Sequence, residues 1–203
     1  MIVQGQAGVQ VNQDGTITNL RVGKNGELIV GDVHGKYFEP TRRGNRYYAA
    51  NQAAVTTTVA LAATYTGLVV SNPASSPVDL VIDKCSFALS VAPVAIATIG
   101  LFTGYSAAGL VTHTTPLTSI AGHYVGNPKG YALADGAATL NGTPQWIMQL
   151  QNGFTAAALP GGVTPAYVDL EGSVVVPPGG YIGIGSLTVV VGFGSIAWEE
   201  VLR

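Results

Sequence analysis

Residues 172–185 read GSVVVPPGGYIGIG, two apolar runs joined by two prolines and two glycines. Valine and isoleucine are branched at Cβ and favour extended strands. Proline fixes φ at the start of a turn, and glycine supplies the positive φ that later turn positions need. The stretch therefore predicts a strand, a tight turn and a second strand.

The same pattern, short apolar runs separated by turn residues, continues from about Ala49 to the end of the chain. A second turn signal, NPASSP at 72–77, again separates two apolar runs, and the alanine-rich segment 49–63 is interrupted by the β-branched run 55–59. The runs that predict strands are 65–71, 80–91, 95–102, 145–151, 168–176, 181–187 and 189–202. Many short strands without helices between them predict an all-β fold, an antiparallel sandwich or barrel. A strand–PPGG–strand unit near the end of a β-rich chain is common in jelly-roll proteins, so we expect an antiparallel β-sandwich with a jelly-roll-like body.

Residues 104–144 contain few such runs and are rich in Gly, Thr, Asn and Pro. We therefore expect a long loop there. Loops of this length are commonly functional or are ordered by a neighbouring subunit.

The N-terminal part of the chain has a different pattern. Asp14-Gly15 and Asn25-Gly26 each separate β-prone residues, which predicts two small hairpins in tandem. Isolated hairpins are marginal in water, so this segment should gain order by packing on a partner. Residues 33–48 mix aromatic and basic side chains and predict an extended arm. We expect an attachment arm at 1–48 and a β-sandwich body at 49–203.

Charge is scarce and unevenly placed. Charged residues are 10% of the chain, against about 25% in an average soluble protein. A chain that is 47% hydrophobic with a net charge of −2 is not intrinsically disordered. The sequence pI of about 5.8 argues against a general nucleic-acid-binding surface. Residues 1–46 carry a net +2 and the remainder a net −4, which supports two differently built regions.

The most apolar window does not predict a membrane span. Residues 87–102 contain Pro93, and a spanning helix needs about 20 predominantly apolar residues. The first ten residues show no signal-peptide pattern. Cys85 is the only cysteine and lies in an apolar run, so we expect a buried strand residue in a protein made in a reducing cytoplasm.

Chemical motifs are weak. Residues 31–35, GDVHG, resemble the first metal motif of metallophosphoesterases, but the second motif is missing and a two-metal site needs more ligands. His113 and His123 have no acidic residue within ten positions, which favours surface or subunit-contact histidines over zinc ligands. Asp169 and Glu171 could share one face of a strand, although a solvated rim is the preferred interpretation. We expect no catalytic residue, no metal and no cofactor.

One cluster has the composition of a binding surface. Lys36, Arg42, Arg43 and Arg46 are interleaved with four aromatic residues between 37 and 48. Arginine with aromatic residues is typical of protein interface hot spots and also of single-strand nucleic-acid platforms. Glu39 and the negative net charge favour a protein partner, and a solvated linker remains the alternative. The predicted partner-binding residues are Tyr37, Phe38, Arg42, Arg43, Arg46 and Tyr47.

Several segments resemble structural proteins encoded near the head genes of tailed bacteriophages. They are residues 26–30 (GELIV), 34–39 (HGKYFE), 43–45 (RGN) and the Ala/Thr/Gly-rich body that ends in 198–201 (WEEV). The resemblance covers most of the chain and carries no catalytic motif. It implies a virion component, such as a capsid decoration or cement protein with a jelly-roll-like body on the capsid surface. The implied partner is the major capsid protein or another virion protein.

A body with so few charges would expose apolar surface as a monomer, which predicts a homodimer or homotrimer. The leading hypothesis is therefore a non-enzymatic capsid decoration protein that self-associates, with no nucleic-acid or membrane partner. The first alternative is a head-fibre or tail-associated protein whose 104–144 loops bind a host receptor. An enzyme, either a metal-dependent phosphoesterase or a glycan hydrolase, is less favoured.

Overall fold

The computed structural model describes residues 35–107, 111–117, 120–126, 130–153 and 165–203, without the side chains of 111 and 151–153. The chain divides into two units, Met1–Glu39 and Pro40–Arg203, and the second unit is called the body below. The hairpins predicted within 1–34 lie outside the described residues.

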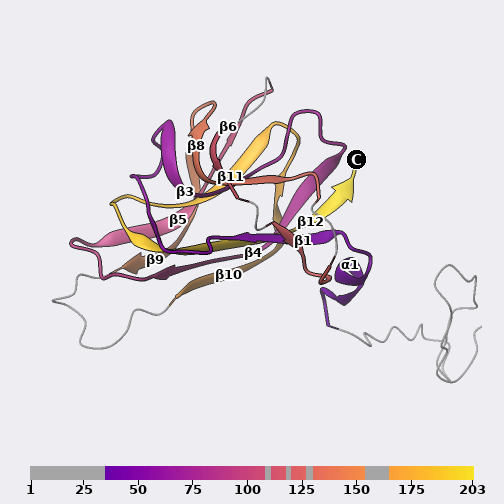
Figure 1. Ribbon diagram of the computed structural model, residues 1–203, viewed down its shortest axis with the longest axis horizontal. Coiled ribbons are helices and arrows are strands. Elements are labelled where there is room, and N and C mark those ends of the chain that lie inside the picture. The colour runs from indigo at the N-terminus through magenta and orange to yellow at the C-terminus, as the bar shows by residue number, and fades with distance from the viewer. Residues whose placement is uncertain (1–34, 108–110, 118–119, 127–129, 154–164) are drawn as a thin grey trace, which may run out of the picture. The chain divides into compact units, whose positions relative to one another are not determined.

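The body contains two antiparallel sheets, so the predicted all-β antiparallel sandwich is confirmed (Figure 1). The first, called the β12 sheet, has the spatial order β10 (Ala166–Val176), β4 (Val78–Leu89), β12 (Val191–Leu202), β1 (Arg46–Ala50) and β7 (Ala121–Gly122), and β2 (Val55–Thr56) also pairs with β12. The second, called the β11 sheet, has the order β6 (Val111–Pro116), β8 (Leu133–Leu140), β3 (Thr64–Ser71), β11 (Gly180–Ser186), β5 (Ala97–Tyr105) and β9 (Gln145–Gly153). The jelly-roll connectivity stays a prediction.

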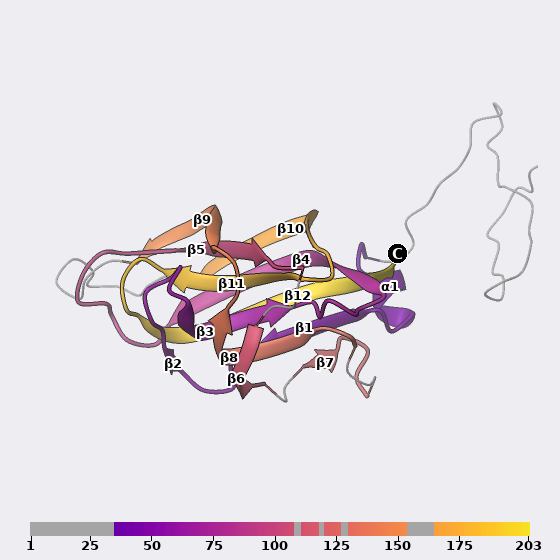
Figure 2. The same ribbon diagram turned by 90° about the horizontal axis from the view of Figure 1, so that it is seen from above.

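The main core lies between the two sheets. On β12, Ile196 and Trp198 point inward and are fully buried. They lie opposite Cys85 and Ile82 of β4, where a register shift on the pairing keeps both apolar pairs on the inner face. Figure 2, turned by 90°, shows the strands β4, β11 and β12 running along the body.

A smaller core lies on the other face of the β11 sheet. The Phe102 ring contacts Tyr65 edge-on at 5.0 Å and Trp146 at 6.2 Å between centroids. The glycines of YIGIG make room for these rings, because a Cβ on Gly183 would lie 2.3 Å from Phe102. Ile182 and Ile184 alternate with those glycines and point into the main core.

Two predictions about the chain's organisation need correction. Residues 104–144 are not one long loop, since β6, β7 and β8 lie within them. The 33–48 segment is not simply extended, because it contains the short helix α1 (Phe38–Arg42) and the start of β1. The proposed boundary at 48 therefore falls inside a strand of the β12 sheet, and the body begins about eight residues earlier, at Pro40.

Candidate functional site

The predicted partner-binding residues separate into two groups. Glu39 lies in the first turn of α1 and Arg42 in its last turn, which suits the helix dipole. The Lys36 ammonium lies 5.2 Å from the centre of the Tyr37 ring. Phe38, Arg42 and Arg43 are exposed. The structure thus leaves these side chains on the surface of their respective units.

Arg46 and Tyr47 are buried in the body, so neither offers the exposed side chain that the sequence predicted. The Arg46 Nε donates to Asp83 Oδ2 at 2.6 Å, and both side chains are more than nine-tenths buried. Tyr47 stacks on Trp198 with ring centroids 6.3 Å apart. The reason is that β1 pairs with β12 from Arg46 onward, so these side chains belong to the fold of the body.

A groove opens where β1 begins and β12 ends, and we call it the β1–β12 groove. Its volume is about 390 Å³, and its walls include Arg43, Tyr47, Tyr131, Glu199, Val201 and Leu202. Only Arg43 and Tyr47 were among the predicted site residues. Tyr131 was missed because it lies in a segment expected to be loop. Glu199 and Glu200, which both line the groove, were noted only within the WEEV resemblance.

Glu200 builds one wall of this groove. Its carboxylate accepts hydrogen bonds from the backbone N–H groups of Tyr131 at 3.0 Å and Ala132 at 3.1 Å, and from Trp198 Nε1 at 3.3 Å. Gly130 leaves room for this carboxylate, because a Cβ there would lie 2.3 Å from it and the Glu200 side chain would have to shift. Glu200 is therefore a structural anchor that positions Tyr131.

The neighbouring carboxylate has a different environment. Burial raises the pKa of Glu199, and the charge of Asp83 adds to this, while Arg46 and Arg43 oppose it. The groove thus presents one arginine and one partly buried carboxylate beside exposed apolar side chains. This combination suits a polypeptide segment with an apolar anchor and a polar flank.

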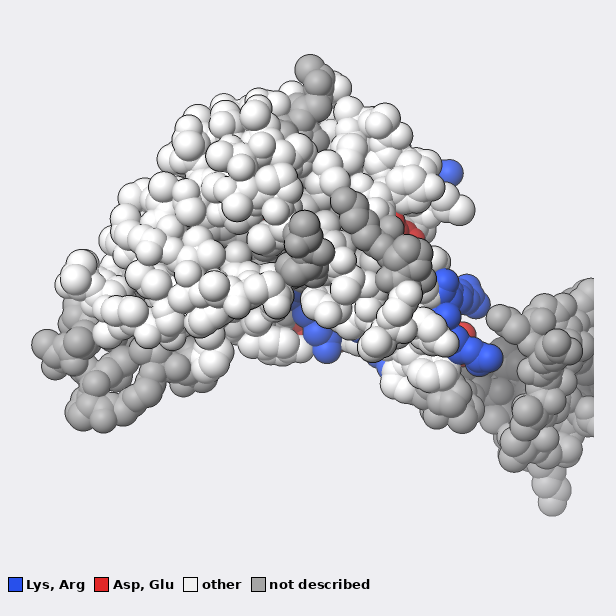
Figure 3. Space-filling model, in the orientation of Figure 1, with Lys and Arg blue, Asp and Glu red and all other residues white. Residues whose placement is uncertain are grey.

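Charge is confined to part of the body. On the face shown in Figure 3, charged side chains extend from the middle of the body to the end that carries the C-terminus. The opposite end is formed by the loops 57–63, 90–96 and 187–190, which carry no charged residue. Backbone hydrogen bonds join these loops to each other or to β12, from Thr57 N to Val190 O and from Ser90 N to Val191 O.

We call these three loops the apolar end. Val94 is 98% exposed and Ile96 is 64% exposed. Other exposed large apolar side chains of the apolar end are Val59, Val91, Leu187 and Val189. Scattered apolar residues are common on protein surfaces, but a contiguous patch without charges usually marks an interface.

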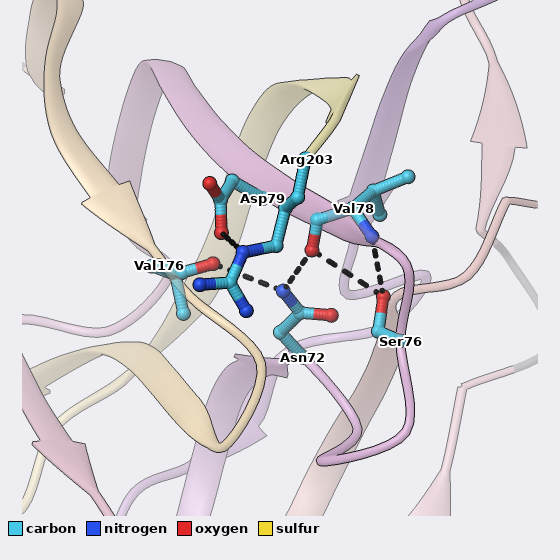
Figure 4. Close-up of polar contacts among 6 residues, drawn as sticks. All are labelled: Asn72, Ser76, Val78, Asp79, Val176 and Arg203. Atoms are coloured by element: carbon cyan, nitrogen blue, oxygen red, sulfur yellow. Dashed lines mark hydrogen bonds and ion pairs between the residues drawn. The ribbon is translucent and has the colours of Figure 1, made fainter.

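The end of the body that carries the C-terminus is held together by polar contacts around Asn72 (Figure 4). The Asn72 amide donates to the carbonyl oxygens of Val78 at 2.8 Å and Val176 at 3.0 Å, and so joins the end of β3 to two strands of the other sheet. Arg203 lies 3.5 Å from Asp79 at the same end. Val78 also lines the β1–β12 groove, so these contacts hold one side of the groove in place.

The residues considered for catalysis or metal binding lie in different parts of the chain. Asp32 and His34 lie outside the described residues. Within the described ranges no group of three or more His, Cys, Asp and Glu side chains is placed to hold a metal ion. Asp169 contacts Lys84 at 3.6 Å and accepts the Glu171 N–H, in a bulge where Glu171 has φ of +51°.

The two histidines were expected at the surface, without acidic neighbours. His113 is exposed as expected, but it bonds to Asp135 through Nδ1 at 2.6 Å, and the Asp135 side chain is fully buried. Sequence spacing could not reveal this pair, since 22 residues separate its members and the pairing of β6 with β8 brings them together. His123 is half-buried and contacts the Tyr48 ring edge-on at 5.1 Å, and burial lowers its pKa.

Comparisons with protein families, curated proteins and solved structures found no match to this chain. Among the described residues, no helix is long and apolar enough to cross a membrane.

Proposed function

We propose that this protein is a non-enzymatic structural component of a virion, a capsid decoration or cement protein that self-associates and binds the capsid lattice. The observation that carries the proposal is the uncharged apolar end. Its exposed valine, isoleucine and leucine side chains would be costly to leave in water on a body that carries so few charges.

The proposal uses two surfaces for two kinds of contact. The apolar end suits contact between copies of the body, since a symmetric dimer or trimer buries the same patch on every subunit. The exposed Arg42 and Arg43 and the β1–β12 groove suit contact with a different protein, such as the major capsid protein. The resemblance to phage head-region proteins supports the identity of that partner.

The experiment is co-sedimentation of the purified protein with undecorated capsids. Because β1 belongs to the body, the truncation should remove Met1–Glu39 and leave Arg46–Ala50 intact. Wild type should bind at a saturating ratio. The double variant Arg42→Glu/Arg43→Glu should bind at least tenfold more weakly, because an interface charge reversal costs several kcal/mol. The truncated protein keeps Arg42, Arg43 and the groove but lacks the rest of the predicted attachment arm, and it should also bind more weakly than wild type.

Failure of wild type to bind the capsid would overturn the proposal, and so would unchanged binding by both variants. Circular dichroism and thermal unfolding of each variant serve as the folding control. A truncated protein that unfolds at the wild-type temperature would show that the body folds alone.

A head-fibre or tail-associated receptor-binding protein is the second candidate. Exposed aromatic side chains within 104–144 favour it, namely Tyr105, Tyr124 and Tyr131. Labelled protein on virions separates the two candidates. Label over the whole shell supports decoration, and label at a single vertex supports the tail.

A further inference from the structure

A second concave surface of the body lies at the edge where β9 and β10 adjoin, the strands that end the β11 sheet and the β12 sheet in the described topology. It is a pocket of about 400 Å³. Its walls are the end of β5, the residues 143 and 145 at the start of β9, and the residues 175–177 at the end of β10. The described residues of these walls carry no charge and belong neither to the β1–β12 groove nor to the apolar end.

The pocket combines an aromatic ring with neutral polar groups. Tyr105 is 58% exposed, and Thr143 and Gln145 are exposed as well, so a ligand can reach all three. The Gln145 amide offers hydrogen-bond donors and an acceptor, and the Thr143 hydroxyl offers both in one group. Exposed Val175 and Pro177 add an apolar wall.

The body holds these groups in place. Gly179 lies against the Tyr105 ring, where a Cβ would come within 2.9 Å of it. The Tyr181 hydroxyl donates to the carbonyl oxygen of Asn141 at 2.9 Å, which ties down the loop that carries Thr143. A site whose groups are already fixed loses less conformational freedom when a ligand binds.

We infer that this pocket binds a neutral saccharide, with one sugar ring against Tyr105 and with sugar hydroxyls bonded to Gln145 and Thr143. The faces of a sugar ring present C–H groups that pack on an aromatic ring, and its hydroxyls both donate and accept hydrogen bonds. The described walls hold no basic side chain for a phosphate, which disfavours a nucleotide. A purely apolar ligand would displace water from the Gln145 amide without replacing its hydrogen bonds.

An extended polypeptide is the competing occupant, because an edge strand can pair with another chain. The saccharide is favoured because the volume is that of a small-molecule site and because the polar groups of its walls are side chains as well as strand backbone. The inference goes beyond the proposed function and holds whether or not the protein decorates a capsid.

The test is a ¹⁵N NMR titration of the full chain with the neutral methyl glycosides of glucose, galactose, mannose and N-acetylglucosamine at millimolar concentration. At least one should cause saturable shifts of the Gln145 side-chain amide and of the backbone amides of Tyr105 and Thr143. Cyclohexanol has a similar ring with a single hydroxyl, and it should cause none at these positions. The capped peptide N-acetyl-Thr-Leu-Thr-amide should also cause none.

Two variants locate the binding. Tyr105→Ala removes the ring and should weaken glycoside binding about tenfold, whereas Tyr105→Phe keeps the ring and should bind as wild type. Gln145→Leu has a similar size and should weaken binding about 2- to 10-fold, the value of one hydrogen bond.

The matched controls lie on the two edge strands but outside the pocket walls. Tyr167→Ala changes an exposed tyrosine at the other end of β10, and Gln149→Leu changes an exposed glutamine further along β9. Both should bind as wild type, and thermal unfolding checks that every variant folds. If Tyr105→Ala does not fold, Gln145→Leu, a change at an exposed side chain, keeps the test decisive.

The inference is overturned if no glycoside causes a saturable shift at the pocket, or if cyclohexanol or the peptide binds as well as the best glycoside. It is also overturned if Gln145→Leu and the folded Tyr105 variants all bind as wild type. None of these outcomes changes the expected result of co-sedimentation with capsids.

Discussion

Arg43 and Arg46 lie three positions apart in one basic segment and have different roles. Arg43 is exposed at the β1–β12 groove, whereas Arg46 is buried in an ion pair with Asp83. Composition alone could not separate them, because the separation comes from where β1 begins to pair with β12.

This difference gives a prediction on stability. Arg46→Ala leaves Asp83 buried without its partner and should lower the free energy of unfolding by about 3–5 kcal/mol. Arg43→Ala should change it by less than about 0.5 kcal/mol, as for other exposed positions. Urea unfolding followed by tryptophan fluorescence measures both. Equal stability of Arg46→Ala and wild type would show that Arg46 has no structural role.

The burial of Cys85 predicts that the folded protein reacts poorly with thiol reagents. Burial raises the pKa of its thiol to about 12, so almost no thiolate forms at pH 8. Ellman's reagent should therefore leave the native protein unmodified and react with one thiol per chain after unfolding in guanidinium. Fast reaction under native conditions would contradict the buried placement.

The burial of Asp135 predicts that the stability of the folded protein depends on pH. Burial raises its pKa above the ordinary aspartate value, and the hydrogen bond and charge of His113 oppose this. The folded state therefore holds the proton more tightly than the unfolded state. The stabilisation that protonated Asp135 contributes is fully present below the pKa that this carboxyl has in the unfolded chain. It is lost as the pH rises through the higher pKa of the folded state.

Asp135→Asn has a similar shape and cannot ionise, so the stability of this variant relative to wild type should increase from pH 3 to pH 5.5. Denaturant unfolding at several pH values measures the difference. A difference that falls over this interval would mean that the folded state favours the ionised carboxylate.

At the scale of elements, the turn that joins β10 to β11 depends on one glycine. Gly179 has φ of +97°, and a Cβ there would lie 2.9 Å from the Tyr105 ring. Gly179→Ala should therefore destabilise the protein by about 1–3 kcal/mol. Gly136→Ala is the matched control, because its Cβ would meet only ordinary contacts beyond 3.6 Å. Equal midpoints of thermal unfolding for the two variants would contradict this role of the turn.

The sequence predicts some strands well and misses others for a physical reason. The seven predicted strands lie within three residues of observed ones at each end, because β-branched residues and glycine or proline turns mark them. The strand β8 was missed because it reads LADGAATL, with small residues that carry little β-propensity. It forms because β3 and β6 pair with it on both sides, which is information held in distant parts of the chain.

The candidate site was predictable to a smaller extent. The basic and aromatic composition drew attention to 37–47, and Arg43 does line a groove. The other walls come from the end of β12 and from Tyr131, which only the folded topology brings beside it. The pairing of His113 with Asp135 could not be predicted for the same reason.

At the scale of the whole molecule, the few charged residues lie away from the exposed apolar side chains of the apolar end. On the face shown in Figure 3, charged side chains lie between the middle of the body and its C-terminal end, and the loops of the apolar end carry no charged residue. Val94 and Val125 are both more than 90% exposed, yet only Val94 belongs to the apolar end. Val94→Glu should therefore weaken self-association at least tenfold, while Val125→Glu should leave it unchanged.

Sedimentation equilibrium of the wild-type protein tests the central claim, that this body works by associating through its apolar surface. We expect a mass of two or three times 20.8 kDa at micromolar concentration, and a shift toward the single-chain mass for Val94→Glu but not for Val125→Glu. A single-chain mass at all concentrations up to several hundred micromolar would contradict it.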